Sequence, residues 1–246
     1  MLLVRSLVFD ACLYGIMGAM GIICAPLALW SVDGAYWTVK SYCRIVLWLL
    51  AAICGLRVEV RGAVPEGSIV VCAKHQSFLD IIILSRFLPR VSFVMKRELR
   101  WAPIIGLYAL RIGSTPVARG QRGRAMQQMV AHAARGEAGV QLVIYPQGTR
   151  VLPGAVAPYK IGAGVLYERL GRPCVPAATN AGVFWSRHSW YRRPGLAVVE
   201  FLAPLPAGLP IPEFMARLEE VVESGSDRLM REAGFDPAAA GALSAS

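Results

Sequence analysis

The sequence predicts an α/β fold in which helices flank a mixed β-sheet, preceded by an apolar helical N-terminus. From about Arg57 onward, short apolar runs alternate with stretches of helical periodicity, as in a layered α/β domain. The 246 residues suffice for one sizeable domain, and no internal repeat or long low-complexity linker divides them. We therefore expect a membrane-associated helical hairpin over residues 1–56, an α/β domain over residues 57–235 and a flexible tail over residues 236–246.

The N-terminal hairpin is expected from two apolar runs, separated by Asp33, Lys40 and Arg44. Ala11–Trp30 holds twenty residues without a charge, the minimum length of a membrane span, whereas the twelve residues of Ile45–Leu56 are too few to cross alone. The chain either spans the membrane once, with its N-terminus inside because of Arg5, or dips into one leaflet and returns. We favour the one-leaflet hairpin. The length of the first run and the lack of a small-residue cleavage site disfavour a signal peptide.

The strands are expected from apolar runs and from residues that alternate with period two. Arg57–Arg61 shows the alternation of a half-buried strand. Ser68–Ala73 and Val140–Tyr145 are continuous apolar runs typical of buried strands, and Pro146 stops the second one. Further extended segments are expected over Val91–Met95, Ser114–Ala118, Val175–Thr179 and Leu196–Phe201.

Five helices are expected between and after these strands. The first begins at Ser77, which forms a capping-box-like start with Asp80, and ends near Pro89 after Phe87. Two others, Trp101–Leu110 and Glu213–Ala233, are indicated by a proline near the start of the former and by apolar residues at helical spacing in the latter. The remaining two are expected over Gly123–Ala134 and Pro158–Leu170. The Ala- and Ser-rich tail after Phe235 is expected to be frayed.

The composition favours an anionic membrane surface as a partner. The chain has 26 Lys and Arg against 16 Asp and Glu, and 55% of its residues are hydrophobic while only 17% are charged. Basic residues interleaved with Trp101, Ile104 and Leu107 between Arg86 and Arg124 suit a surface that meets anionic headgroups. Nucleic acid is disfavoured, because neither a recognised motif nor an aromatic stacking platform accompanies this stretch. The six cysteines form no C-x-x-C pair, so we assign no metal.

A candidate catalytic pair lies where an apolar strand meets a helix. His75 follows the strand Ser68–Ala73, and Asp80 falls in the first turn of the helix capped by Ser77. Residues five apart in one regular helix point about 140° away from each other, but here the chain folds before the cap and lets the imidazole reach the carboxylate. Such a carboxylate fixes the imidazole tautomer and stabilises its charged form. The alternative is a surface histidine near a helix cap.

A second candidate segment, Pro146–Arg150, follows the strand that ends at Tyr145. Gly148 lets the backbone turn and approach a ligand, Thr149 offers a hydroxyl, and the Arg150 guanidinium suits a phosphate. Ligand sites in α/β sheets lie off the carboxyl ends of strands, and both candidate segments follow strands directly. The alternative is an ordinary β-turn with a solvated arginine.

Four ordered blocks resemble the glycerolipid acyltransferase family, most closely the bacterial 1-acyl-sn-glycerol-3-phosphate acyltransferases, over roughly Arg57 to Phe201. His75 and Asp80 match the family's H-x4-D motif. The other blocks are Lys96–Leu99 with Pro103, Gly106, Gly113 and Arg119; Tyr145–Arg150, similar to F-P-E-G-T-R; and Val175–Ala178.

The resemblance implies transfer of a fatty acyl group from acyl carrier protein or coenzyme A to the sn-2 hydroxyl of lysophosphatidic acid, giving phosphatidic acid. His75 is then the general base and Asp80 its orienting carboxylate. Gly148, Thr149 and Arg150 are expected to bind the acceptor's phosphate, with Lys96, Arg119 and Lys160 as further contributors. No metal or organic cofactor is implied, and the expected location is the inner (cytoplasmic) membrane with the site facing the cytoplasm.

One residue departs from the family pattern: Gln147 stands where the family usually carries glutamate. We expect Gln147 to keep an orienting role through hydrogen bonds to Arg150 or a substrate hydroxyl, since glutamine keeps the length and one acceptor oxygen. Two alternatives stay open. One is a related O-acyltransferase acting on another lysolipid, such as lyso-ornithine lipid, and the other is a non-catalytic lipid-binding protein at the membrane surface.

Overall fold

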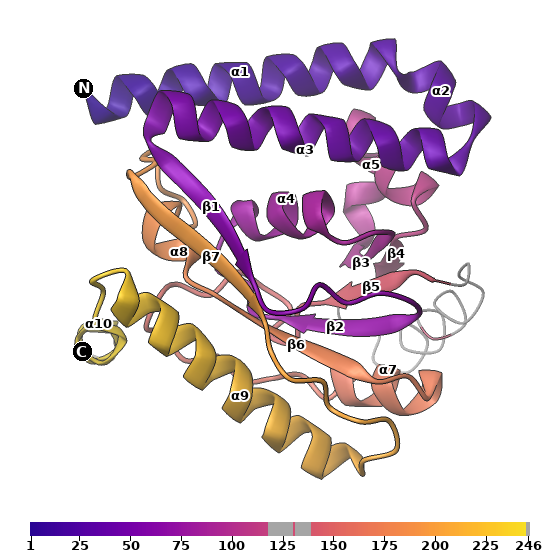
Figure 1. Ribbon diagram of the computed structural model, residues 1–246, viewed down its shortest axis with the longest axis vertical. Coiled ribbons are helices and arrows are strands. Elements are labelled where there is room, and N and C mark those ends of the chain that lie inside the picture. The colour runs from indigo at the N-terminus through magenta and orange to yellow at the C-terminus, as the bar shows by residue number, and fades with distance from the viewer. Residues whose placement is uncertain (118–129, 131–138, 245–246) are drawn as a thin grey trace.

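A mixed β-sheet forms the centre of the molecule in the computed structural model, which describes residues 1–117, 130 and 139–244 (Figure 1). Within these residues seven strands pair in the order β1-β7-β6-β2-β5-β3-β4, all in parallel except β6 with β7. This confirms the predicted fold class. The strands are β1 (Leu56–Arg61), β2 (Ile69–Ala73), β3 (Val91–Lys96), β4 (Thr115–Val117), β5 (Gln141–Ile144), β6 (Cys174–Thr179) and β7 (Gly195–Phe201).

Four neighbouring parallel strands, β6, β2, β5 and β3, end at the same edge of the sheet. β2 and β5 are buried almost throughout, as expected from their continuous apolar sequences, because helices cover both faces of the sheet. The last residues of these strands are Thr179, Ala73, Ile144 and Lys96, respectively, so His75 and Tyr145 follow within two residues of a strand end. The topology therefore gathers at one edge the two candidate segments that are about 70 residues apart in the sequence.

Helices form layers on both sides of the sheet (Figure 1). On one side lie α4 (Phe78–Phe87), the 3-10 turn η1 (Arg97–Trp101) and α5 (Pro103–Arg111), covered in turn by the hairpin of α1 (Leu2–Ile23), α2 (Ala25–Trp30) and α3 (Val32–Cys54). The other side carries α7 (Gly162–Leu170) and α9 (Ile211–Glu232). The short α8 (Ala181–Phe184) follows β6, and α10 (Pro237–Ser244) follows α9.

The second arm of the hairpin is longer than the twelve-residue apolar run suggested. α3 begins at Val32, so Asp33, Lys40 and Arg44 lie inside the helix rather than between two arms. The charges are accommodated because Asp33 pairs with Arg90 at 2.9 Å and Lys40 donates to the Leu88 carbonyl oxygen. As a result both α1 and α3 are long and apolar enough to cross a membrane, judged by length and composition alone.

Other elements differ from the predictions mainly at their ends. The segment before α7 is irregular until Ile161, and η1 precedes the α-helix that begins at Pro103. The tail expected to fray after Phe235 instead forms α10. The helix expected over 123–134 lies outside the described residues.

Candidate active site

The predicted catalytic pair is in place at the carboxyl end of β2. Nδ1 of His75 lies 3.2 Å from Oδ2 of Asp80, and the two side chains are 12% and 1% exposed. Because Nδ1 is taken up by the carboxylate, Nε2 is the nitrogen left to act on a substrate. The tautomer thus follows from the contact with Asp80.

Asp80 is held as a carboxylate acceptor by the start of α4. Its Oδ2 accepts hydrogen bonds from the backbone N–H groups of Gln76 at 2.7 Å and Ser77 at 2.8 Å, in addition to the contact with His75. Ser77 caps the helix, and its hydroxyl oxygen accepts from the Leu79 N–H. The capping box that the sequence predicted therefore also aims the carboxylate at the imidazole.

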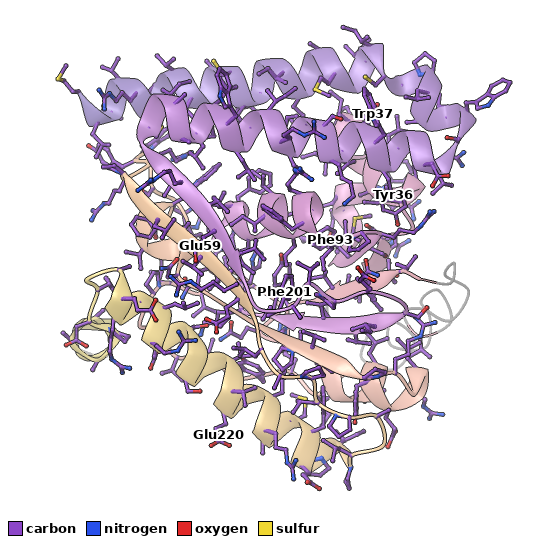
Figure 2. All side chains as sticks on the ribbon, viewed as in Figure 1. Tyr36, Trp37, Glu59, Phe93, Phe201 and Glu220 are labelled. Carbon is purple, nitrogen blue, oxygen red and sulfur yellow. The ribbon has the colours of Figure 1, made fainter. Side chains whose placement is uncertain are left out.

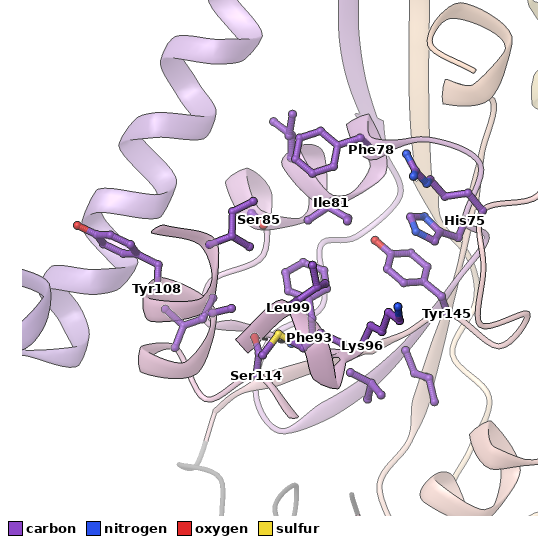
Figure 3. Close-up of a pocket in the computed structure, with 18 of the residues that line it drawn as sticks. His75, Phe78, Ile81, Ser85, Phe93, Lys96, Leu99, Tyr108, Ser114 and Tyr145 are labelled. Atoms are coloured by element: carbon purple, nitrogen blue, oxygen red, sulfur yellow. Dashed lines mark hydrogen bonds between the residues drawn. The ribbon is translucent and has the colours of Figure 1, made fainter. Parts of the chain in front are cut away.

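Tyr145 forms a platform for the histidine ring. The rings stack with centroids 3.9 Å apart and planes 17° apart, at one end of an internal cavity (Figure 3). Burial, followed by the negative charge of Asp80, raises the pKa of Tyr145, so the phenol stays neutral. Sequence reasoning included Tyr145 in the third block but did not foresee this stacking.

The Pro146–Arg150 segment forms the predicted turn beside His75. Gly148 has a φ of 67°, a backbone conformation that favours glycine, and the Lys160 side chain lies against it, with Nζ 2.8 Å from where a Cβ would stand. The Val151 N–H donates to the His75 carbonyl oxygen at 2.8 Å, which fixes the turn against the end of β2. The two candidate segments thus form one site.

Arg187, in the loop after α8, is a site residue that sequence reasoning missed. Its Nη1 donates to the Thr149 hydroxyl oxygen and to the Arg150 carbonyl oxygen, each at 3.2 Å. No carboxylate of the described chain lies within ion-pair distance of Arg150 or Arg187. Burial, then the positive charge of Arg187, lowers the pKa of Arg150. Asp80 attracts Arg150 less than these effects disfavour its charge, so two neighbouring guanidinium groups without an ion-pair partner in the described chain favour the binding of an anion.

The site opens into a large, mainly apolar cavity of about 1140 Å³. Figure 3 shows His75 and Tyr145 on one side of this space and Tyr108 on the other. Its walls come from α1, α3, α4, α5 and the sheet, and include Met17, Met20, Val39, Phe78, Ile81, Phe93 and Ile104. The volume exceeds the 300–1,000 Å³ usual for small-molecule sites, so the cavity has room for a long apolar chain.

The structure brings most of the predicted phosphate ligands together. Lys96 and Lys160 line the same cavity as His75, Thr149 and Arg150, although Lys96 also lies 3.7 Å from Glu98. Arg119 lies outside the described residues. Gln147 is buried, and its amide contacts Glu223 on α9 rather than Arg150, so the expected contact with Arg150 is not formed.

Part of the basic stretch after Arg86 binds the hairpin rather than facing outward. Arg111 donates to the carbonyl oxygens of Ala28 and Leu29, and Arg90 pairs with Asp33. Arg100 remains at the surface with its guanidinium 4.4 Å from the centre of the exposed Trp101 ring. The stretch therefore serves both to dock the hairpin and to present positive charge.

Comparisons with known proteins identify the family of the chain. A family model described as Acyltransferase matches residues 56–180. The chain is 30% identical over 223 residues to a Pseudomonas aeruginosa 1-acyl-sn-glycerol-3-phosphate acyltransferase, covering 88% of this chain and 85% of the relative. It is 31% identical over 200 residues to the Homo sapiens 1-acyl-sn-glycerol-3-phosphate acyltransferase alpha, covering 78% and 70%.

The fold is also found in a solved structure. The crystal structure of the 1-acyl-sn-glycerophosphate (LPA) acyltransferase PlsC from Thermotoga maritima matches with a TM-score of 0.77 at 20% identity, covering 93% of this chain and 98% of that chain. At this identity the match shows the shared fold. Together with the family model and the Pseudomonas relative, it leads to one conclusion: this chain belongs to the acyltransferase family.

Proposed function

We propose that this protein transfers a fatty acyl group from an acyl thioester to the sn-2 hydroxyl of lysophosphatidic acid, giving phosphatidic acid. The observation that carries the proposal is the position of the His75–Asp80 pair, between an apolar cavity and a group of uncompensated cations. An acylated glycerol phosphate has the two parts that such a site accepts. The names of the Pseudomonas and human relatives support the same acceptor.

The geometry supplies a general-base mechanism. Nε2 of His75 takes the proton of the acceptor hydroxyl while its oxygen attacks the thioester carbonyl carbon. The tetrahedral intermediate collapses by breaking the C–S bond, and the departing thiolate takes the proton from the imidazolium. Asp80, itself held by two backbone N–H groups, stabilises the imidazolium between these steps. No step requires a covalent acyl-enzyme.

The acceptor's phosphate is assigned to the cations at the same end of the cavity. Arg150 and Arg187 are neighbours and Lys160 lies against Gly148, so a dianionic phosphate monoester would neutralise charges that otherwise repel each other. A lyso-ornithine lipid, the other candidate acceptor, carries one carboxylate and one amine and so has no net charge. These cations therefore attract it less strongly than a phosphate dianion. A Brucella abortus relative bears the name lyso-ornithine lipid O-acyltransferase, at 27% identity over 182 residues, so both acceptors belong in the test.

The membrane is assigned to the outer face of the α1–α3 hairpin. Exposed apolar side chains gather there, and include Val4, Tyr14, Ile22, Ile23, Trp30, Trp37 and Trp48. Figure 2 shows Trp37 on α3, on the side of the molecule remote from α9. Anionic headgroups beside this face would meet Arg100 and Trp101. We place the hairpin in the cytoplasmic leaflet of the inner membrane, where acyl carrier protein and coenzyme A thioesters are accessible.

The decisive experiment offers purified protein a panel of acceptors with both donors and identifies the products by mass. The acceptors are lysophosphatidic acid, lyso-ornithine lipid and a monoacylglycerol without phosphate; the donors are acyl thioesters of acyl carrier protein and coenzyme A. We expect phosphatidic acid as the main product. Equal transfer to the monoacylglycerol would contradict the role given to Arg150.

The first prediction concerns the base. His75→Ala should lower the rate of acyl transfer by about 100-fold or more, because general-base catalysis contributes about 10²–10⁴. Association with anionic vesicles should persist, since His75 lies inside the site, whereas the apolar face of the hairpin is unchanged. The matched control is His188→Asn, at a loop position with a φ of 65° that asparagine tolerates. Full activity of the His75 variant would exclude this mechanism; a wild type that binds vesicles without transferring acyl groups would identify a lipid-binding protein.

A further inference from the structure

A polar cluster lies beneath the active site, on the side of the sheet covered by α9. We call Lys74, Gln147, Tyr159 and Glu223 the Glu223 cluster. Lys74 directly precedes His75, but its side chain is only 2% exposed and its Nζ atom lies 2.5 Å from Oε2 of Glu223. A buried ammonium group is stable only beside a carboxylate, so Lys74 depends on Glu223.

The other oxygen of Glu223 holds two further segments. Its Oε1 accepts a hydrogen bond from the Tyr159 hydroxyl at 2.9 Å and another from the Gln147 amide at 3.3 Å. Burial, then the charge of Glu223, raises the pKa of Tyr159, so the phenol keeps its proton and remains a donor. Oε1 of Gln147 has no hydrogen-bond partner in the described part of the chain, so Glu223 supplies the contact that orients this amide.

Each donor in the cluster stands one position before a residue of the active site. Lys74 precedes His75, Gln147 precedes Gly148, and Tyr159 precedes Lys160. One carboxylate on α9 therefore fixes the end of β2, the turn after β5 and the segment that brings Lys160 to Gly148. A displacement of about 1 Å in any of these three segments would misplace His75, the turn at Gly148 or Lys160 relative to the substrate. Misplacement of this size lowers the rate of catalysis strongly.

The same contacts explain why residue 147 is a glutamine here. A glutamate at this position would place a second carboxylate about 3.3 Å from Glu223, with one ammonium group to balance the two. An amide instead donates to Glu223 and leaves the buried Lys74 ammonium group balanced by one carboxylate. A single carboxylate is needed in this cluster, and α9 provides it.

We infer that Glu223 is a positioning residue of the acyltransferase site, and that its carboxylate is the acceptor which holds Lys74, Gln147 and Tyr159 beside the site. The inference deepens the proposed function and rests on it. It also assigns α9, on the opposite side of the sheet from the cavity, a part in organising catalysis.

The test is an exchange of the carboxylate between the two positions. Glu223→Gln should lower kcat/KM for acyl transfer by about 10-fold or more and lower Tm by about 5 °C or more, since it leaves Lys74 buried without its partner. Gln147→Glu should lower kcat/KM because it adds an unbalanced buried charge. The double variant Gln147→Glu/Glu223→Gln restores one carboxylate and one amide. It should bring Tm back up toward the wild-type value and return kcat/KM to within about 3-fold of wild type.

The control is Glu220→Gln on the same helix. Glu220 is exposed and lies on the side of α9 remote from the sheet (Figure 2), so this variant should match wild type. If the double variant regains Tm but not activity, Glu223 is structural only and the positioning role is wrong. A Glu223→Gln variant with unchanged kcat/KM would overturn the inference as well. The proposed function has its own test: it is wrong if wild-type protein does not acylate lysophosphatidic acid. In that case kcat/KM of the Glu223 and Gln147 variants is measured with the acceptor that wild-type protein does acylate.

Discussion

At the scale of single residues, the proposed site combines a carboxylate with several partners and cations that lack an acidic one. The Asp80 carboxylate accepts from two backbone donors and contacts His75, whereas Arg187 donates to the Thr149 hydroxyl and the Arg150 carbonyl oxygen and has no ion-pair partner in the described chain. In the proposed mechanism the first arrangement fixes the base, and the second offers positive charge to the acceptor's phosphate. A second observation also favours an anion beside Arg187. Its buried Nε atom has no hydrogen-bond partner in the described chain.

Arg187→Ala tests this assignment. We expect KM for lysophosphatidic acid to rise about 10-fold or more, since a hydrogen bond between charged groups contributes about 1.5–3 kcal/mol. KM for the acyl thioester should change little, because Arg187 lies at the phosphate end of the site. Arg193→Ala, in the same loop but exposed, is the matched control and should behave as wild type. An unchanged KM for lysophosphatidic acid in the Arg187 variant would remove this residue from the phosphate site.

At the scale of helices and strands, local signals predicted most of what the structure shows. The strand before His75 was recognisable because a strand buried on both faces is apolar at every position, and α4 because Ser77 and Asp80 form a capping box. The start of α3 was missed because charges at 33, 40 and 44 look like a boundary unless their partners, such as Arg90, are known. Arg187 and Glu223 were missed for the same reason: each acts through contacts with distant segments.

The contact between α1 and the loop that carries Arg187 gives an element-scale prediction. Asp10, in α1, forms two hydrogen bonds with Arg192, at 2.8 and 3.0 Å, and the two side chains are 17% and 8% exposed. Asp10→Asn should therefore destabilise the protein by about 3 kcal/mol, seen as a Tm lower by about 6 °C or more. The pair Asp33–Arg90 offers the control: the Asp33 side chain is 82% exposed, and Asp33→Asn should cost less than about 1 kcal/mol. Equal Tm changes for the two variants would show that α1 is not clamped to this loop.

At the scale of the whole molecule, the hairpin and the sheet cannot be treated as an anchor and a separate catalyst. Phe9 and Leu13 of α1 and Val46 and Leu50 of α3 belong to the same hydrophobic core as Val71 of β2. α1 and α3 also supply Met17, Met20, Gly21, Thr38, Val39, Tyr42 and Cys43 to the cavity wall. If the hairpin contacts the membrane as proposed, an acyl chain in this cavity would lie between α1 and α3 and the His75–Asp80 pair, in one continuous apolar environment.

This arrangement predicts where the turn of the hairpin lies relative to the membrane. The turn is tied to the α/β domain by Arg111, which donates to the Ala28 and Leu29 carbonyl oxygens, and by the Asp33–Arg90 pair. Two spanning helices would put the turn on the far side of the membrane and break these contacts; a hairpin in one leaflet keeps them. Ser31→Cys, with the native cysteines replaced by alanine, should therefore react with a membrane-impermeant maleimide only from the face that carries the α/β domain. Ala207→Cys, an exposed position in that domain, marks this face as the control. Labelling of Ser31→Cys from the opposite face of sealed vesicles would show that both helices cross the membrane.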